Sequence, residues 1–163
     1  MRIARIEQTL EECEQHLYAS SAYGTEIESL LTQSLLVLMC AEFEQKIEAL
    51  VQEKCSSVAD TSIKEFLGSC MGAVFRSVKS SEMAGLLNRF GSPYKEAFKQ
   101  KMEENPVAET FYNNIVTNRH AVAHSEGSNA TLREVKQFYE KGHVVLDFFR
   151  EALLSTGNNA AGA

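Results

Sequence analysis

Apolar residues recur along this chain at steps of three and four, the spacing that places side chains on one face of an α-helix. The pattern runs through the stretch 2–21, where its members are Ile3, Ile6, Leu10, Cys13 and Leu17. It returns in the stretch 26–54 as a stripe of Leu36, Cys40, Phe43, Ile47 and Leu50. No stretch shows the strict alternation of a half-buried strand. The spacing therefore predicts an all-helical protein.

Helix start signals divide this periodic pattern into elements. Two of them are capping boxes, in which a threonine is followed three residues later by a glutamate: Thr25 with Glu28, and Thr131 with Glu134. A third is Asn105-Pro106, a capping residue followed by a proline at the first helical position. These signals predict a bundle of four main helices, over 2–21, 26–54, 105 to about 125, and 131–154.

The segment 55–104 is less regular and predicts short helices inserted between the second and third main helices. Asp60 or Thr61 is placed to cap one of them, Ser80-Ser81 another, and Ser92, which precedes Pro93, a third. The segment is locally basic through Lys64, Arg76, Lys79, Arg89, Lys95, Lys99 and Lys101. This charge fits a solvated face of connecting helices, and it also fits a surface that guides a nucleic acid.

The last main helix carries an apolar seam of Leu132, Val135, Tyr139, Gly142, Leu146, Phe149 and Leu153. Because glycine has no side chain, Gly142 predicts that a neighbouring element approaches closely there. The tail 155–163, STGNNAAGA, has no large apolar residue to bury and is expected to be disordered. We therefore expect one domain over 1–154 and a disordered C-terminal tail over 155–163.

Composition excludes several classes of protein. The formal net charge of -6 gives no global positive field of the kind that drives non-specific nucleic-acid binding. The longest purely apolar run, Leu35 to Ala41, is too short to cross a membrane, and the first residues lack a secretory hydrophobic region. Cys13, Cys40, Cys55 and Cys70 are widely spaced and predict reduced thiols in a cytoplasmic protein.

The stretch Asn114 to His124, NIVTNRHAVAH, is unusually polar for a periodic helix. Arg119 falls within the apolar arc of its helix at ideal helical spacing, where a guanidinium is costly unless something pairs with it. A second row of the 26–54 helix, Leu30, Val37, Glu44 and Val51, is aliphatic except for Glu44. Glu44 is therefore the candidate buried carboxylate that pairs with Arg119.

Arg119 and His124 form an R-x4-H pattern with a polar residue directly after the arginine. This pattern, at the end of the third main helix of an all-helical chain, resembles the HEPN superfamily. NRHAVAHSEG followed by TLREV is similar to the RiboL-PSP and MAE_28990/MAE_18760 groups of that superfamily, as is EFEQKIE at Glu42 to Glu48. The resemblance covers about 25–54 and 105–154, and it implies an all-α, HEPN-like helical bundle.

The resemblance also implies a metal-independent endoribonuclease that needs no cofactor. In this chemistry an RNA 2'-hydroxyl attacks the adjacent phosphate and leaves a 2',3'-cyclic phosphate. An imidazole that titrates near neutrality suits the proton transfer, so His124 is assigned to acid/base work. A guanidinium suits the charged phosphoryl oxygens, so Arg119 is assigned to the phosphate. His120 is expected to assist, and Asn118 to bond substrate or backbone.

On an ideal helix, Arg119 and His124 point about 140° apart, so one protomer does not make an obvious pocket. The HEPN resemblance implies a site composed of two motifs facing each other across a dimer. We therefore expect a homodimer with the third and fourth main helices at its interface. The same resemblance implies an RNA substrate and an antitoxin protein as a further partner. It also implies a role in a toxin–antitoxin or antiviral defence system.

Other interpretations of these residues stay open. Arg119 could be a structural residue paired with Glu44. His120 and His124, four residues apart, could bind zinc, although two further ligands are not evident, or they could lie on a solvated face. The whole domain could be a catalytically inactive HEPN module for dimerisation or partner binding.

Overall fold

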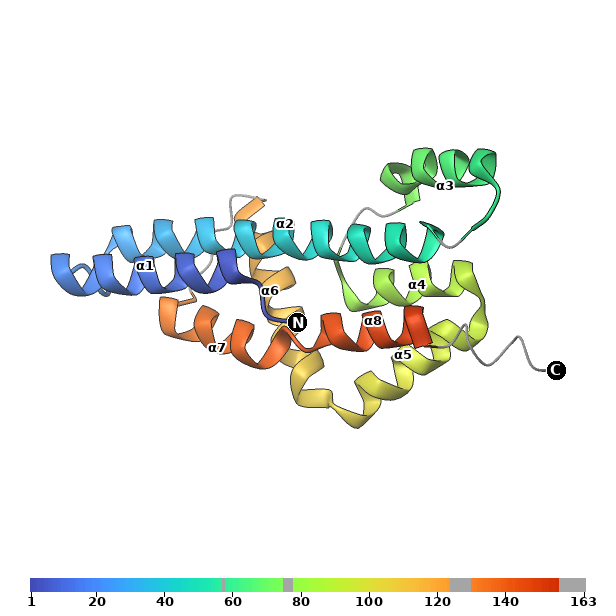
Figure 1. Cartoon of the computed structure of the whole chain (residues 1–163). Helices are drawn as coiled ribbons and strands as arrows, with labels where there is room; N and C mark the ends of the chain where they lie inside the picture. Colours follow the sequence, from blue (N-terminus) through green and yellow to red (C-terminus); the bar gives the residue numbers. More distant parts are fainter. Residues whose placement is uncertain (57, 75–77, 124–129, 156–163) are drawn as a thin grey trace. The chain divides into compact units, whose positions relative to one another are not determined.

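The protein is described here by a computed structural model, which places residues 1–56, 58–74, 78–123 and 130–155 (Figure 1). Within these ranges the side chains of Leu67, Ser155 and residues 70–74 are left undescribed. The helices are α1 (Ala4–Ser20), α2 (Glu26–Ser56), α3 (Thr61–Val74), α4 (Ser80–Phe90), α5 (Ser92–Glu104), α6 (Pro106–Ala123), α7 (Leu132–Gly142) and α8 (Val145–Ser155). The described ranges contain no strand, which confirms the predicted all-α fold.

The chain forms two compact units that do not follow chain order. Unit 1 comprises 1–42 and 107–145, and unit 2 comprises 43–106 together with the segment from Leu146 onward. The helix α2 contributes its first part to unit 1 and its second part to unit 2. A single domain over 1–154 stays a prediction. The tail predicted to be disordered lies outside the described residues, apart from Ser155 at the end of α8.

Unit 1 packs α1, the first part of α2, α6 and α7 around an aliphatic and aromatic core. Its most buried side chains include Ile6, Leu17, Leu35, Leu36, Met39, Tyr112, Ile115, Val135 and Tyr139. The Tyr139 hydroxyl accepts a hydrogen bond from the backbone N–H of Ile3 at 2.7 Å. A buried tyrosine needs such a partner, and this bond ties α7 to the residues that precede α1.

Gly142 lies where α7 meets the backbone of α6, as its place on the seam predicted. A Cβ atom built on Gly142 would lie 2.7 Å from the backbone nitrogen of Tyr112 and 2.9 Å from its Cα. Both distances are shorter than a van der Waals contact between such atoms. The absence of a side chain at Gly142 is therefore what lets these two helices pack at this separation.

The predicted continuous final helix over 131–154 is wrong, because α7 ends at Gly142 and α8 begins at Val145. The seam residues on both sides of the break are nevertheless buried: Leu132, Val135, Tyr139, Leu146, Phe149 and Leu153. His143, in the break, keeps helical dihedrals and donates its N–H to the Tyr139 carbonyl. Periodicity continues across so short an interruption, and glycine is the weakest helix former after proline.

Unit 2 contains the short helices that were predicted between the second and third main helices. The helices α4 and α5 pack on each other, and Phe98 of α5 meets Phe149 of α8 edge to face at 6.2 Å. Asp60 caps α3, since its carboxylate accepts the N–H groups of Ser62 at 2.8 Å and Ile63 at 3.3 Å. The other two predicted caps are wrong: the N-cap positions belong to Lys79 for α4 and Gly91 for α5, with no side-chain cap bond at either.

Candidate functional site

The helix α6 places Arg119 on the side that faces the core of unit 1. Ala108, Tyr112, Ile115 and Val116 are the buried residues of α6. Arg119 follows Ile115 by four residues and Val116 by three, so it shares their face. Arg119 itself is only half-buried, because it lies in the last turns of α6, where exposure increases. Its aliphatic stem can therefore pack on the core while the guanidinium reaches water.

His120 and Asn118 flank Arg119 in the same part of α6. His120 is half-buried and lies in the last turn of the helix. The Asn118 amide nitrogen donates to the Asn114 carbonyl of the preceding turn at 2.8 Å. This bond is the backbone contact expected of Asn118, and it engages the amide within its own helix.

His124 lies outside the described residues, directly after Ala123 at the end of α6. The structure therefore places the first part of the R-x4-H motif and not its histidine. The role assigned to His124 stays a prediction.

Glu44 is half-buried on the second part of α2, which belongs to unit 2, whereas Arg119 belongs to unit 1. The Glu44 carboxylate is thus more exposed than the sequence predicted. Its pairing with Arg119 stays a prediction.

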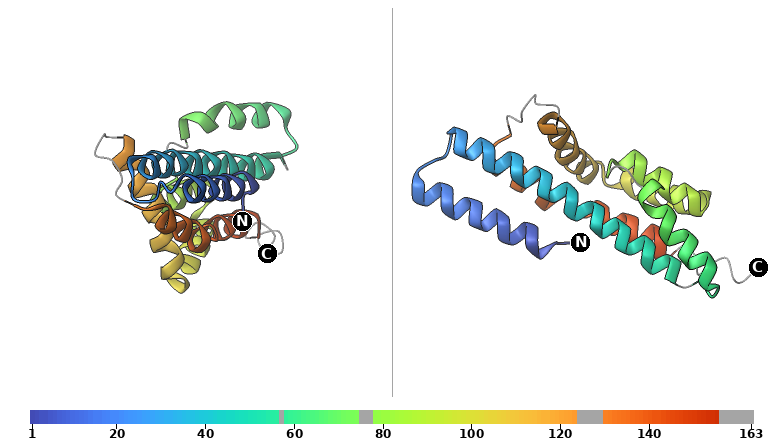
Figure 2. Two further views of the ribbon diagram at one scale, coloured as in Figure 1. Left: turned by 90° about the vertical axis from the view of Figure 1, so that its left-hand side faces the viewer. Right: turned by 90° about the horizontal axis from the view of Figure 1, so that it is seen from above.

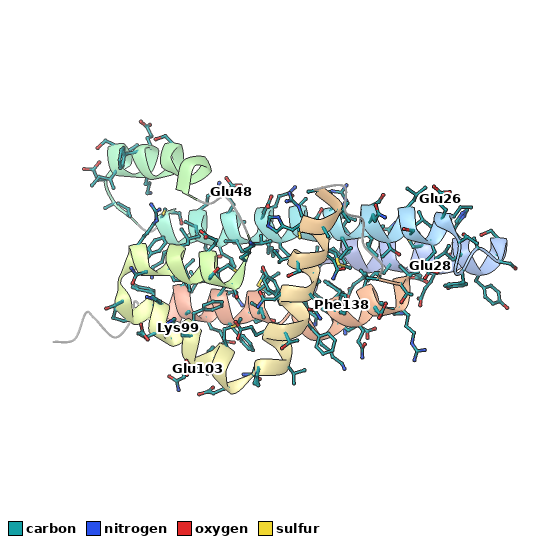
Figure 3. The ribbon with its side chains drawn as sticks, turned by 180° about the vertical axis from the view of Figure 1, so that it is seen from behind. Glu26, Glu28, Glu48, Lys99, Glu103 and Phe138 are labelled. Carbon is teal, nitrogen blue, oxygen red and sulfur yellow. The ribbon has the colours of Figure 1, made fainter. Side chains whose placement is uncertain are left out.

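The buried carboxylate that the structure does show in unit 1 is Glu28, which is 8% exposed. Its Oε2 atom accepts the Gly24 N–H at 2.6 Å, and its Oε1 atom accepts the Leu132 N–H at 3.0 Å. Glu28 lies on the part of α2 that faces α7 (Figure 3). One side chain therefore caps the first residue of α7 and also bonds the turn that precedes α2.

The Glu28 bonds correct the first predicted capping box. Thr25 Oγ1 does accept a bond from the Ile27 N–H, at 3.3 Å, but the Glu28 carboxylate bonds the Gly24 N–H and not that of Thr25. The Thr-x-x-Glu spacing identified Glu28 as a capping residue. No local signal could reveal its second partner, Leu132, because that residue lies 104 positions away in the chain.

The second predicted capping box is confirmed at the start of α7, where Thr131 and Glu134 bond each other's backbone. The Thr131 N–H donates to the Glu134 carboxylate at 2.8 Å, and the Glu134 N–H donates to the Thr131 hydroxyl oxygen at 3.3 Å. The N–H and hydroxyl of Thr131 lower the pKa of the Glu134 carboxyl group, because both bonds favour its ionised form. With Glu28, this box gives α7 two capping carboxylates.

Two adjoining cavities lie along α1 and α7 in unit 1, with volumes of about 500 Å³ and 350 Å³. Both are lined by Glu14, Lys136 and Glu140. The Lys136 ammonium donates to the Glu14 carboxylate at 2.7 Å, and this bond raises the pKa of Lys136. Neither lining includes Arg119 or His120, so these cavities are separate from the predicted motif.

Clusters of metal ligands and membrane-spanning helices are both absent from the described ranges. No group of three or more histidine, cysteine or acidic side chains there is arranged to hold a metal ion. No helix within those ranges is both long and apolar enough to cross a membrane.

No curated protein and no solved structure matches the chain. A protein-family model described as RiboL-PSP-HEPN does match, over residues 1–155 of the 163. The match extends through α3, α4 and α5, which lie outside the stretches 25–54 and 105–154 that carry the motif resemblance. The chain therefore belongs to the RiboL-PSP-HEPN family.

Proposed function

We propose that this protein is a metal-independent endoribonuclease that acts as a toxin or antiviral effector in the cytoplasm. The observation that carries the proposal is the placement of Arg119. It lies near the end of α6, half-buried on the core-facing side, with His120 beside it and His124 next after the last described residue of that helix. Membership of a HEPN family supports RNA as the substrate class.

In the proposed reaction, the RNA 2'-hydroxyl attacks the adjacent phosphorus, and the bond from phosphorus to the 5'-oxygen breaks. A base must take the proton of the 2'-hydroxyl, and an acid must supply one to the departing 5'-oxygen. We assign this proton transfer to His124. We assign the stabilisation of the charge that develops on the phosphoryl oxygens to Arg119, because its guanidinium can bond two of these oxygens at once.

His120 and Asn118 are assigned supporting roles, and Glu44 is assigned to the orientation of Arg119. Arg119 shares a helix face with the buried Ile115 and Val116, and a stem packed on that face would limit the positions open to its guanidinium, which favours this division of labour.

The proposal includes a homodimer, because ideal helical spacing, if continued to His124, would direct Arg119 and His124 about 140° apart. Two copies of the motif facing each other supply both residue types to one site. The two histidines of such a pair can act as base and acid on the same phosphate. An antitoxin protein is the further partner expected of a ribonuclease that is harmful to its own cell.

A catalytically inactive module is the alternative. In this alternative the family fold serves only dimerisation or the binding of another protein.

Expression in cells tests the proposal against this alternative. The wild-type chain should slow growth and degrade cellular RNA, whereas His124→Ala should do neither. His16→Ala is the matched control, because His16 is exposed on α1 and should keep full toxicity. If wild type and His124→Ala are equally harmless, the inactive module is the better description.

A further inference from the structure

The first part of α2 is apolar on more sides than unit 1 covers. From Ser29 to Ala41 the helix reads SLLTQSLLVLMCA and contains no charged residue. Its core side is buried through Thr32, Leu35, Leu36, Met39 and Cys40. On the other side, Ile27, Leu30 and Val37 are 46%, 57% and 45% exposed. A helix that is apolar all round is normally buried all round.

The exposed apolar residues are continuous along the helix. Steps of three and four connect Ile27, Leu30, Leu31, Ser34, Val37, Leu38 and Ala41, which we call the open stripe. Within it Ser34 is exposed, and Leu31, Leu38 and Ala41 are half-buried. Among the described residues of unit 1, α1 and α6 lie on opposite sides of α2 and α7 lies below it, which leaves the remaining side without a neighbouring helix (Figure 2).

The chemistry of the open stripe fits a second copy of this chain. Cores of protein interfaces are depleted of charge, and the open stripe has none. A two-fold interface requires a patch that is complementary to itself, and an uncharged aliphatic stripe meets this condition. Ser34, in the middle of the stripe, is small enough to let two helices approach closely. No charge within the stripe selects a partner of opposite sign.

The position of the open stripe agrees with a composite site. In the views of Figures 1 and 2, the C-terminal end of α6, which carries Arg119 and His120, lies beside α2 within unit 1. A two-fold axis through the middle of the stripe would therefore bring the ends of two α6 helices to the same region of a dimer.

We propose that the open stripe is the face on which a second copy docks, with α2 packed against α2 about a two-fold axis. The proposal deepens the proposed function, since it names the surface that assembles the composite site. It also moves the centre of the interface to α2, whereas the sequence predicted an interface of the third and fourth main helices. The residues that carry the association are Ile27, Leu30 and Val37.

Sedimentation velocity on the full chain tests this interface. The wild type should be a dimer, and the double substitution Leu30→Glu with Val37→Glu should raise the dimer Kd by more than about 100-fold, because each carboxylate enters a two-fold interface twice and is buried unpaired. Val107→Glu is the matched control. Val107 is also an exposed aliphatic residue, at 60%, but it lies at the opposite end of α6 from Arg119 and should leave the dimer intact.

Circular dichroism of each variant shows whether a monomeric variant is folded. If the double variant does not fold, the single substitution Leu30→Ser takes its place. A wild-type monomer, including one that docks a different protein on the open stripe, overturns the proposal. So does a dimer that survives both stripe substitutions, or one that Val107→Glu disrupts to the same extent.

An RNA cleavage assay on the same samples separates this proposal from the proposed function. If the stripe variants are monomers and even the wild-type dimer leaves RNA intact, the interface stands and the ribonuclease fails. If the wild type cleaves RNA and remains a dimer after the stripe substitutions, the ribonuclease stands and the interface fails.

Discussion

Substitution of Gly142 by alanine probes the contact between α6 and α7 that holds the motif helix in unit 1. The new Cβ atom would lie 2.7 Å from the Tyr112 nitrogen, 2.9 Å from its Cα and 3.1 Å from the Phe111 carbonyl carbon. All three atoms belong to backbone in the middle of α6, so no side chain can rotate away. The two helices must separate by several tenths of an ångström.

The expected cost follows from two opposing terms. Overpacking of a well-packed contact costs about 1–3 kcal/mol. Replacement of glycine by alanine in a helix raises the free energy of unfolding by up to about 1 kcal/mol, and by less at Gly142 because it is the last residue of α7. The net loss is therefore about 1–2 kcal/mol, which lowers the Tm by about 2–8 °C for a chain of this size.

Thermal and urea unfolding measure this loss, and Gly85→Ala supplies the matched control. Gly85 is also helical, in α4, but a Cβ atom built there meets no atom within 4 Å. Gly85→Ala should therefore stabilise the protein by up to about 1 kcal/mol, through helix propensity alone. Equal or greater stability of Gly142→Ala would refute the close approach of α6 and α7.

Three further predictions follow from the capping residues and the two units. Glu28→Ala should cost about 2–4 kcal/mol in urea unfolding, because it leaves the N–H groups of Gly24 and Leu132 without their carboxylate acceptor; an unchanged midpoint would contradict this. Thr131→Ala should cost about 1 kcal/mol near neutral pH. The lowered pKa of Glu134 stabilises the fold at pH values above its unfolded pKa of about 4.3, and this stabilisation is lost as the pH falls through the folded pKa. Because Thr131→Ala removes one of the bonds that lower this pKa, the variant should lose less stability in acid than the wild type does. A single domain over 1–154 predicts one cooperative thermal transition by calorimetry, and two separate transitions would show independent units.

Burial was easier to predict from the sequence than continuity. The seam of the last main helix named residues that are buried in both α7 and α8, but it did not reveal the break between them. Apolar periodicity reports the face of a helix, and a short helical turn at His143 keeps that face in register. The sequence shows only that Gly142 lacks a side chain. The structure shows why that matters, because the backbone of α6 lies where a Cβ atom would be.

Apolar spacing also could not separate a covered row from an open one. Leu30, Val37 and Val51 belong to one heptad row, yet Leu30 and Val37 are about half exposed and Val51 is buried. The difference depends on which neighbours pack against each part of α2, and that information is spread over the whole chain. An exposed part of such a row is therefore informative about assembly.

The candidate site was predictable as a motif and a helix face. Arg119 could be placed on the core-facing side of α6 because helical spacing is regular. The buried carboxylate of unit 1 could not be identified in the same way, because the partner of Glu28 in α7 is distant in sequence. Glu44, which interrupts an aliphatic row, is half-buried in unit 2, and its pairing with Arg119 stays a prediction.

The chemistry of the RNA ends tests the central claim most directly. Purified wild-type protein, incubated with RNA and an excess of chelator, should produce fragments with 2',3'-cyclic phosphate and 5'-hydroxyl ends. His124→Ala should abolish these fragments, Arg119→Lys should reduce them strongly because an ammonium cannot bond two phosphoryl oxygens in a fixed plane, and His16→Ala should match the wild type. Cleavage that stops in chelator, other end groups, or full activity of His124→Ala would contradict the proposed function.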